Sequence, residues 1–290
     1  MNSICIMGFW YSGSGAVYDY LHGYDRVISF DDKGEPMICR NILNHIWDSI
    51  HLNSGSLDIQ KIYDRCFAED NQELYTSFYQ HKRSKEFFSK YGTSIINEAL
   101  EKLFKDYKGK TLRDIIRGSH SMISVFSKNL PPEQHILFDQ NPDATRPDMT
   151  CLIPNSKGIA VIRDPKDNLA ELRRSCRGHL KLETFVDQYK YRLNHFIDGM
   201  SFLKNSLPEY FNNVKLVEFE KFVFDNKERE RVKKFVGIQS SKYRSYFNPI
   251  VSQNNVNIHE RLTELEKEII DKELSELRYS VLEQFGGWGE

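Results

Sequence analysis

Three glycines and two serines follow a short, mostly apolar segment near the beginning of the chain. Residues 3–7 read SICIM, residues 8–15 read GFWYSGSG, and residues 16–21 have the pattern of a first helical turn. Glycines allow successive backbone N–H groups to converge on an anion, and a helix N-terminus adds about half a positive charge. This order of strand, loop and helix predicts a cradle for a diphosphate-like group. A tight turn without a ligand is the alternative.

The loop has the glycine spacing of a phosphate-binding loop without its metal chemistry. Ser14 stands where a nucleoside-triphosphatase loop carries lysine, and Gly15 stands where it carries the magnesium-binding Ser or Thr. The five cysteines are scattered without a Cys-x-x-Cys pair, so neither a zinc site nor a disulfide framework is indicated. The sequence therefore predicts anion binding without a metal ion.

A second candidate for anion binding is Arg163, which follows an apolar segment. Residues 161–167 read VIRDPKD, so the arginine is expected at the end of a strand, and Pro165 suits the first position of a helix. The carboxyl ends of parallel strands are where open α/β sheets bind ligands. Arg163 is therefore placed to reach a ligand held by the glycine loop. Alternatively, Arg163 and Asp164 form only a local capping pair.

The elements that must position these groups indicate an α/β fold. Buried-strand patterns occur at residues 3–7, 135–138, 158–162 and 214–218, and helix-like stretches follow them. Parallel neighbours need long crossover connections, so we expect a central, mainly parallel sheet flanked by helices. Long amphipathic helices are predicted at residues 183–207 and 262–282, and a helical insertion at about 45–130. In the absence of a linker-like tract, residues 1–290 are predicted to form a single domain.

Composition limits the classes of partner. The chain has 40 Lys and Arg residues against 41 Asp and Glu, for a formal net charge of -1, so no overall field attracts nucleic acid or an anionic membrane. No long apolar run predicts a transmembrane segment, and no basic region precedes the first strand as in a signal peptide. We expect a cytoplasmic protein whose anion site is local.

These segments together resemble the sulfotransferases, especially the carbohydrate sulfotransferases. The loop at 8–15 is similar to their 5′-phosphosulfate loop, and residues 161–177, with Arg-Asp-Pro, are similar to their 3′-phosphate segment. Further similarities follow in the family's order: Gly34-Glu35-Pro36, the strand at 137–142, the LVEFEKF segment at 216–222, the FVGI segment at 235–238 and the FGGW segment at 285–288. The resemblance spans nearly the whole chain outside about 45–130.

The resemblance implies a P-loop-like sulfotransferase architecture and a reaction. Such an enzyme binds 3′-phosphoadenosine 5′-phosphosulfate (PAPS) and transfers the sulfuryl group without metal to an acceptor, here a small molecule or, more specifically, a saccharide hydroxyl. Arg163 would bind the 3′-phosphate, and Glu171 occupies a further position of that segment. The 5′-phosphosulfate would be held by Tyr11, Ser12, Gly13, Ser14, Gly15 and Ala16.

The same resemblance indicates catalytic candidates. Glu35 would be the general base that takes the proton from the acceptor hydroxyl, with Asp139 and then His120 as the other candidates. Ser12 or Ser14, together with the loop amides, would stabilise the charge that develops on the leaving oxygen.

Three positions depart from the family pattern. Tyr11 replaces the usual loop Lys or Arg, Gln140 replaces a Lys, and Glu171 replaces a Ser that contacts the 3′-phosphate. Either other cations compensate or the ligand is not PAPS; the candidate cations are Arg40, Lys166, Arg173, Arg174 and Arg244. The alternative functions are a P-loop kinase or other nucleotide-dependent transferase, and a degenerate, non-catalytic member that binds an anion.

Overall fold

The computed structural model describes the two ends of the chain more fully than its middle. It covers residues 2–29, 43, 46–47, 98–99, 101–103, 105, 111–127, 134–139, 142–175 and 180–288. All elements named below lie within these residues. The expected helical insertion at 45–130 is therefore described only in part, and its described residues at 98–99, 101–103, 105 and 112–127 are helical.

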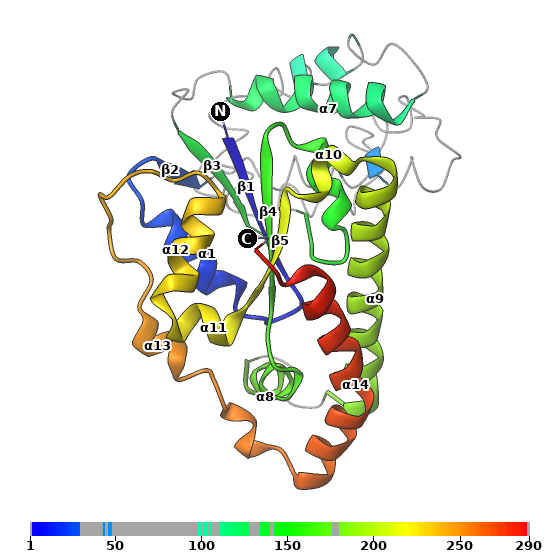
Figure 1. Ribbon diagram of the computed structural model, residues 1–290, viewed down its shortest axis with the longest axis vertical. Helices are drawn as coiled ribbons and strands as arrows, with labels where there is room; N and C mark the ends of the chain where they lie inside the picture. Colours follow the sequence, from blue (N-terminus) through cyan, green and yellow to red (C-terminus); the bar gives the residue numbers. More distant parts are fainter. Residues whose placement is uncertain are drawn as a thin grey trace, which may run out of the picture. The chain divides into compact units, whose positions relative to one another are not determined.

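The described strands form one five-stranded parallel sheet flanked by helices, which confirms the predicted α/β fold (Figure 1). The strands are β1 (Asn2–Gly8), β2 (Val27–Ser29), β3 (His135–Asp139), β4 (Ser156–Ile162) and β5 (Val214–Glu218), in the order β2-β3-β1-β4-β5. The register of β4 on β5 runs from Gly158 opposite Val214 to Ile162 opposite Glu218. The four predicted strands are present, and the short β2 was not predicted.

Burial explains why these segments form strands. Residues 4–7 of β1 and residues 159–162 of β4 are fully buried. A strand that is covered on both faces needs consecutive apolar side chains rather than an alternating pattern. The apolar runs in the sequence therefore mark the central strands.

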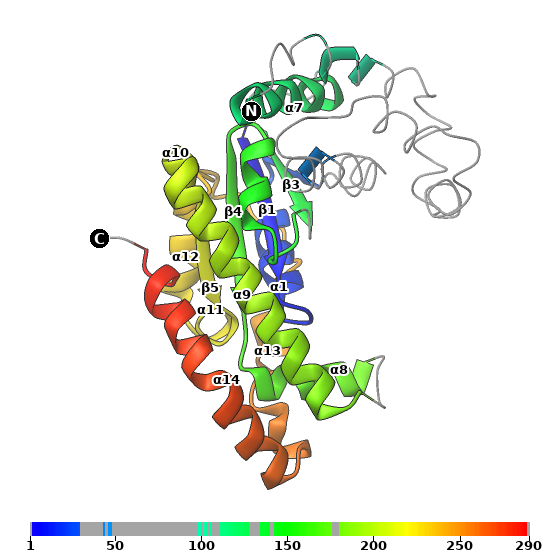
Figure 2. The same ribbon diagram turned by 90° about the vertical axis from the view of Figure 1, so that its right-hand side faces the viewer.

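Helices flank this sheet. They are α1 (Ser14–His22), α7 (Leu112–Ser127), α8 (Pro165–Ser175), α9 (Leu182–Ser206), α10 (Pro208–Phe211), α11 (Phe219–Phe224), α12 (Asn226–Phe235), α13 (Pro249–Gln253) and α14 (Glu264–Phe285), with short 3-10 helices η2 (Pro147–Leu152) and η3 (Ile258–Arg261). The two long predicted helices are confirmed as α9 and α14. They lie side by side in both views (Figures 1 and 2), with the rings of Phe196 and Phe285 5.5 Å apart and Lys190 paired with Glu273.

The chain divides into two compact units. One comprises Met1–Ser3, Ile28–Phe138 and Cys151–Ser156, and the other comprises Ile4–Val27, Asp139–Thr150 and Lys157–Glu290. The glycine loop and Arg163 both belong to the second unit. The single domain over residues 1–290 stays a prediction.

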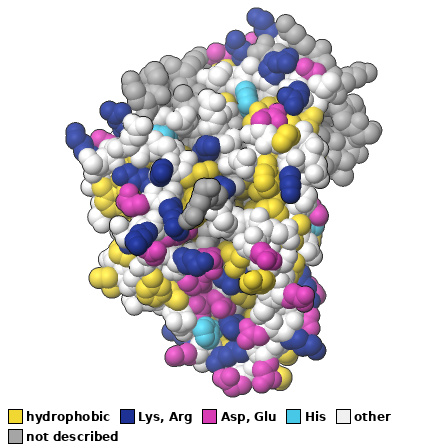
Figure 3. All heavy atoms as spheres, in the orientation of Figure 1, with side chains coloured by type: hydrophobic (Ala, Val, Ile, Leu, Met, Phe, Trp, Pro, Cys, Tyr) yellow, Lys and Arg dark blue, Asp and Glu magenta, His cyan; other side chains and the backbone are white. Residues whose placement is uncertain are grey.

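The surface of the second unit carries both signs of charge. Over the face formed by α8, α11 and α14, acidic and basic side chains are intermingled (Figure 3). No described helix combines the length and the apolar composition that crossing a membrane would require. That any anion-binding site depends on local groups stays a prediction from the near-zero net charge.

Candidate anion-binding site

The loop between β1 and α1 is held by hydrogen bonds to one of its own serines and from α8. The buried Ser12 accepts a hydrogen bond at Oγ from the backbone N–H of Phe9, 3.0 Å away. The side-chain amide of Asn168 on α8 donates to the carbonyl of Phe9 at 3.3 Å. Trp10 and Tyr11 have φ angles of 63° and 55°, a left-handed conformation that is strained for bulky residues. The surrounding contacts hold this strain in the loop.

Gly13 turns the loop into α1. Its φ is 84°, and a Cβ at this position would lie 2.2 Å from Cδ2 of Phe219, so only glycine fits. As the N-cap residue, Gly13 provides no side-chain hydrogen bond to the first turn of α1. Backbone N–H groups at a helix N-terminus that lack a side-chain cap favour a bound anion. The local geometry therefore agrees with the predicted cradle.

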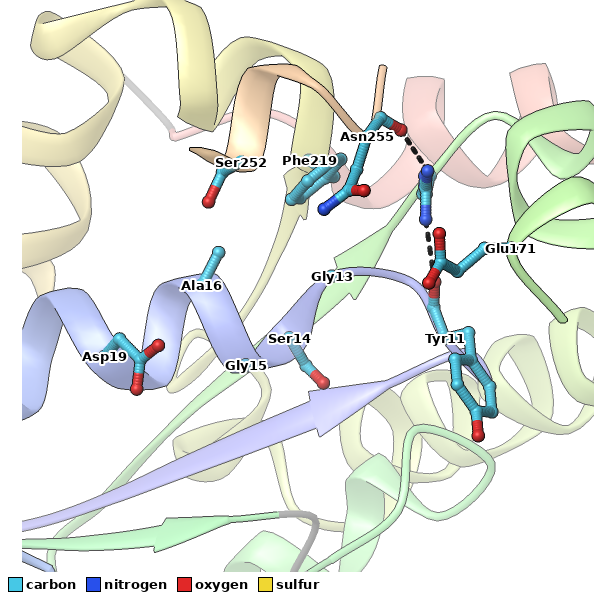
Figure 4. Close-up of a pocket in the computed structure, with 11 residues that line it drawn as sticks. Tyr11, Gly13, Ser14, Gly15, Ala16, Asp19, Glu171, Phe219, Ser252 and Asn255 are labelled. Atoms are coloured by element: carbon cyan, nitrogen blue, oxygen red, sulfur yellow. Dashed lines mark hydrogen bonds between the residues drawn. The ribbon is translucent and has the colours of Figure 1, made fainter. Parts of the chain in front are cut away.

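A cavity of about 420 Å³ opens beside this helix N-terminus (Figure 4). It is lined by Tyr11, Gly13, Ser14, Gly15, Ala16, Asp19, Arg163, Glu171, Phe219, Ser252 and Asn255. A Cβ built on Gly15 would meet no atom within 4 Å. The space in front of the glycine is therefore large enough for a ligand group to approach the backbone.

Arg163 closes one end of the cavity. The residue is only 2% exposed, and its Nη1 donates to the carbonyl of Tyr11 at 3.3 Å while its Nη2 donates to the carbonyl of Asn255. Its Nε is buried without a hydrogen-bond partner. Burial lowers the pKa of the guanidinium, but arginine stays charged at any physiological pH. A buried cation thus links the glycine loop to the C-terminal part of the chain.

The turn that carries Arg163 is fixed from two sides. The hydroxyl of Tyr189 donates to the Arg163 carbonyl at 2.9 Å, and Glu220 accepts from the backbone N–H of Asp164 at 2.7 Å. Burial raises the pKa of Glu220. Asp164 accepts from the N–H of Lys166 at 2.8 Å, so the capping role expected for Asp164 is present together with the placement of Arg163 at the cavity.

The segment Ile258–Arg261 and the residues before it are anchored to α8 by one buried carboxylate. Asp167, 1% exposed, accepts from the backbone N–H groups of Asn257 at 2.7 Å and His259 at 3.0 Å, and from the His259 ring at 2.6 Å. These three bonds hold the chain just after Asn255. They therefore determine where Asn255 meets Arg163.

Glu171 faces two arginines. Its Oε2 lies 2.6 Å from Nη2 of Arg174, and its Oε1 accepts from the hydroxyl of Ser175 at 2.8 Å. Burial opposes ionisation, but the bonds from Arg174 and Ser175 and the charge of Arg163 hold the pKa of Glu171 below its usual value. The carboxylate is therefore an anion at neutral pH, on the wall of a cavity predicted to bind anions.

Most of the predicted binding residues come together. Tyr11, Gly13, Ser14, Gly15, Ala16, Arg163 and Glu171 all line the cavity. Ser12 does not, because its hydroxyl is used inside the loop; its proposed catalytic role stays a prediction.

The candidate bases are placed differently. Glu35 lies outside the described residues, and Asp139 ends β3 with a side chain that also falls outside them. His120 belongs to the first unit, where its Nε2 lies 2.8 Å from the carbonyl oxygen of Cys151 and burial lowers its pKa.

The cations that could compensate for the missing loop Lys or Arg differ in their contacts. Lys166 pairs with Asp271, and Arg173 pairs with Glu266, both on α14. Arg244 is exposed, and Arg40 lies outside the described residues. Among the described candidates, Arg174 is the one whose side chain contacts residues of the cavity wall, Glu171 and Asn255.

The sequence reasoning missed four lining residues as site residues, namely Asp19, Phe219, Ser252 and Asn255. Asp19 follows Gly15 by four positions on α1, so helical periodicity would have placed both on one face. Ser252 and Asn255 have no such local signal. They reach the cavity because the chain folds back over α8, which brings Asn255 within hydrogen-bonding distance of a residue 92 positions away.

Comparison with known proteins adds no family to this picture. No family model matches the chain, and no curated protein sequence is similar to it at a significant level. What is established for this chain is therefore its α/β fold. Its candidate site is the cavity lined by the loop between β1 and α1 and by Arg163.

Proposed function

We propose that this protein is a sulfotransferase-like enzyme that transfers a sulfuryl group from PAPS to an acceptor hydroxyl on a saccharide. The observation that carries the proposal is the meeting of a buried arginine, Arg163, with an uncapped helix N-terminus in one cavity. A loop whose backbone N–H groups can hold one anion, beside the cation Arg163, suits a ligand with two separated anionic groups. The ordered resemblance of the sequence to sulfotransferases supports the same assignment.

The residues present fit such a donor in part. The open space beside Gly15 would admit a phosphosulfate group to the first turn of α1. Arg163, on the wall of the same cavity, would supply positive charge for a phosphate. The donor would supply the sulfuryl group. The backbone N–H groups at the α1 N-terminus, which no side chain caps, would stabilise charge on the leaving oxygen.

The acceptor proton requires a base from the chain. Glu35 is the first candidate because its Glu-Pro setting resembles the carbohydrate sulfotransferases, and Asp139 is the second because it ends a strand of the sheet. His120 is the third candidate, and its lowered pKa would keep it neutral and able to accept a proton near pH 7.

Calorimetry with 3′-phosphoadenosine 5′-phosphate tests the proposal. The enzyme is expected to bind this product without magnesium, and chelation by EDTA is expected to leave the affinity unchanged. If the nucleotide does not bind at millimolar concentration, the proposed donor is wrong. If binding requires magnesium, a P-loop kinase or related nucleotide-dependent transferase is the better assignment.

One observation favours a non-catalytic anion-binding protein as the second candidate. The cavity wall contains two carboxylates, Asp19 and Glu171, beside the single cation Arg163. Turnover of labelled PAPS with any saccharide acceptor would exclude this second function, whereas nucleotide binding without turnover would favour it.

A further inference from the structure

A salt-bridged cluster lies at the Arg163 end of the cavity, where the proposed function places the 3′-phosphate of the donor. Asp167, Glu171 and Arg174 are spaced by four and then three residues on α8, so they share one face of this helix. That face meets Arg163 and Asn255. The salt-bridged cluster consists of Arg163, Glu171, Arg174 and Asn255.

Asn255 connects the two arginines. Its backbone carbonyl accepts from Nη2 of Arg163, and its side-chain oxygen accepts from Nη2 of Arg174 at 3.0 Å. The two guanidinium groups thus contact the same residue. Like charges held this close repel each other, and the charge of Arg174 adds to burial in lowering the pKa of Arg163. Two neighbouring cations need an anion beside them.

Glu171 is that anion in the present arrangement. Its carboxylate is ion-paired with Arg174 and interacts electrostatically with Arg163. The side chain of Glu171 is 14% exposed and that of Arg174 is 41% exposed. Arg174 therefore has freedom to reorient that the buried Arg163 lacks.

We propose that Arg174 is the second cation for the 3′-phosphate and that Glu171 is an internal counter-anion, which the phosphate must displace. This inference rests on the proposed function and explains how the site works with glutamate where the resembling family has serine. The phosphate would take over the two guanidinium groups, and Glu171 would keep its bond to Ser175. A nucleotide without a 3′-phosphate has no anionic group that could replace the Glu171 carboxylate beside the two guanidinium groups.

Isothermal titration calorimetry with two probes tests this, namely 3′-phosphoadenosine 5′-phosphate and adenosine 5′-phosphate. Arg174→Ala is expected to weaken binding of the bisphosphate about tenfold or more, since a charge-assisted hydrogen bond is lost. Glu171→Gln is expected to strengthen binding of the bisphosphate by about tenfold, because the competing negative charge is removed while the Ser175 bond is kept. Affinity for the monophosphate should change less than about twofold in both variants.

Arg173→Ala is the matched control, since it removes the same charge one residue earlier from a side chain that pairs with Glu266 on α14. Thermal unfolding of each variant reports whether it folds. The inference is wrong, while the proposed function stands, if the wild type binds the bisphosphate but Arg174→Ala lowers the affinity for both nucleotides equally. The same holds if Glu171→Gln lowers the affinity for the bisphosphate. If the wild type does not bind the bisphosphate, both are wrong.

Discussion

The ring of Phe219 lies against the backbone of Gly13, where a Cβ would be 2.2 Å from Cδ2 of the ring. Phe219 begins α11 directly after β5, and Gly13 immediately precedes α1. This contact leaves no room for a side chain at the point where the loop turns into the helix. Of the atoms that a Cβ at Gly13 would meet, Cδ2 of Phe219 is the nearest.

Replacing this glycine should therefore damage the fold and the site together. Gly13→Ala would force the Phe219 ring to move and would place alanine at a φ of 84°. The expected loss is about 1–3 kcal/mol of unfolding free energy, together with loss of nucleotide binding. Urea unfolding and calorimetry measure the two effects.

Gly15→Ala, in the first turn of α1, is the matched comparison. A Cβ at Gly15 meets nothing within 4 Å, so the variant should be as stable as the wild type or slightly more stable. Its methyl group would occupy space in the cavity, and nucleotide affinity should fall. Unchanged affinity in a stable Gly15→Ala variant would mean that the ligand does not approach this part of α1.

Removing the guanidinium of Arg163 should weaken nucleotide binding. Arg163→Ala is expected to cost about 2 kcal/mol of binding free energy for the bisphosphate, the value of a charge-assisted hydrogen bond. Calorimetry gives this difference, and circular dichroism shows whether the variant folds. If the variant folds and binds with the wild-type affinity, the role of Arg163 is only structural, through its hydrogen bonds to Tyr11 and Asn255.

The carboxylate of Asp167 should matter for stability although it does not line the cavity. Asp167→Ala leaves two backbone N–H groups and the His259 ring without their acceptor, which is expected to destabilise the protein by about 2–4 kcal/mol. Hydrogen exchange should show increased exchange at Asn257 and His259. Protection unchanged at those two amides would contradict the anchoring role of Asp167.

The ion pair between Arg173 and Glu266 should make stability depend on pH. Burial raises the pKa of Glu266, but its bonds to Arg173 and Thr263 outweigh burial and hold the pKa below the usual 4.5. A lowered pKa stabilises the folded state above the unfolded-state value, and this contribution is lost as the pH falls through the folded-state value. Glu266→Gln should therefore lower the unfolding free energy at pH 7, and the difference from the wild type should shrink as the pH is lowered below 4.5. The exposed Glu276 provides a control substitution to Gln on the same helix.

The general base can be assigned by separating binding from turnover. Glu35→Gln should abolish sulfuryl transfer and leave the affinity for 3′-phosphoadenosine 5′-phosphate unchanged, because the amide cannot accept the acceptor proton. Steady-state kinetics and calorimetry on the same preparation measure both quantities. Wild-type turnover in Glu35→Gln would transfer the assignment to Asp139.

Local pattern was sufficient for much of the fold. The apolar runs predicted β1, β3, β4 and β5, and the spacing of apolar residues predicted α9 and α14, because strand and helix periodicity are properties of neighbouring residues. The short β2 was missed, since three residues carry no periodic signal. The glycines, Arg163 and Glu171 could be selected as site residues because their motifs are contiguous in sequence.

Tertiary structure decided what these residues can do. Asn255 and Ser252 enter the cavity only because the chain folds back over α8, and no spacing in the sequence encodes a contact across 92 residues. The pairing of Arg174 with Glu171, rather than with an acid on α14 as for Arg173, depends on which face of α8 meets the cavity. The sequence by itself determined an α/β chain and predicted that the glycine loop binds an anion without a metal ion. Only the fold decided which charges surround that loop, because side-chain direction and long-range contact are set by packing.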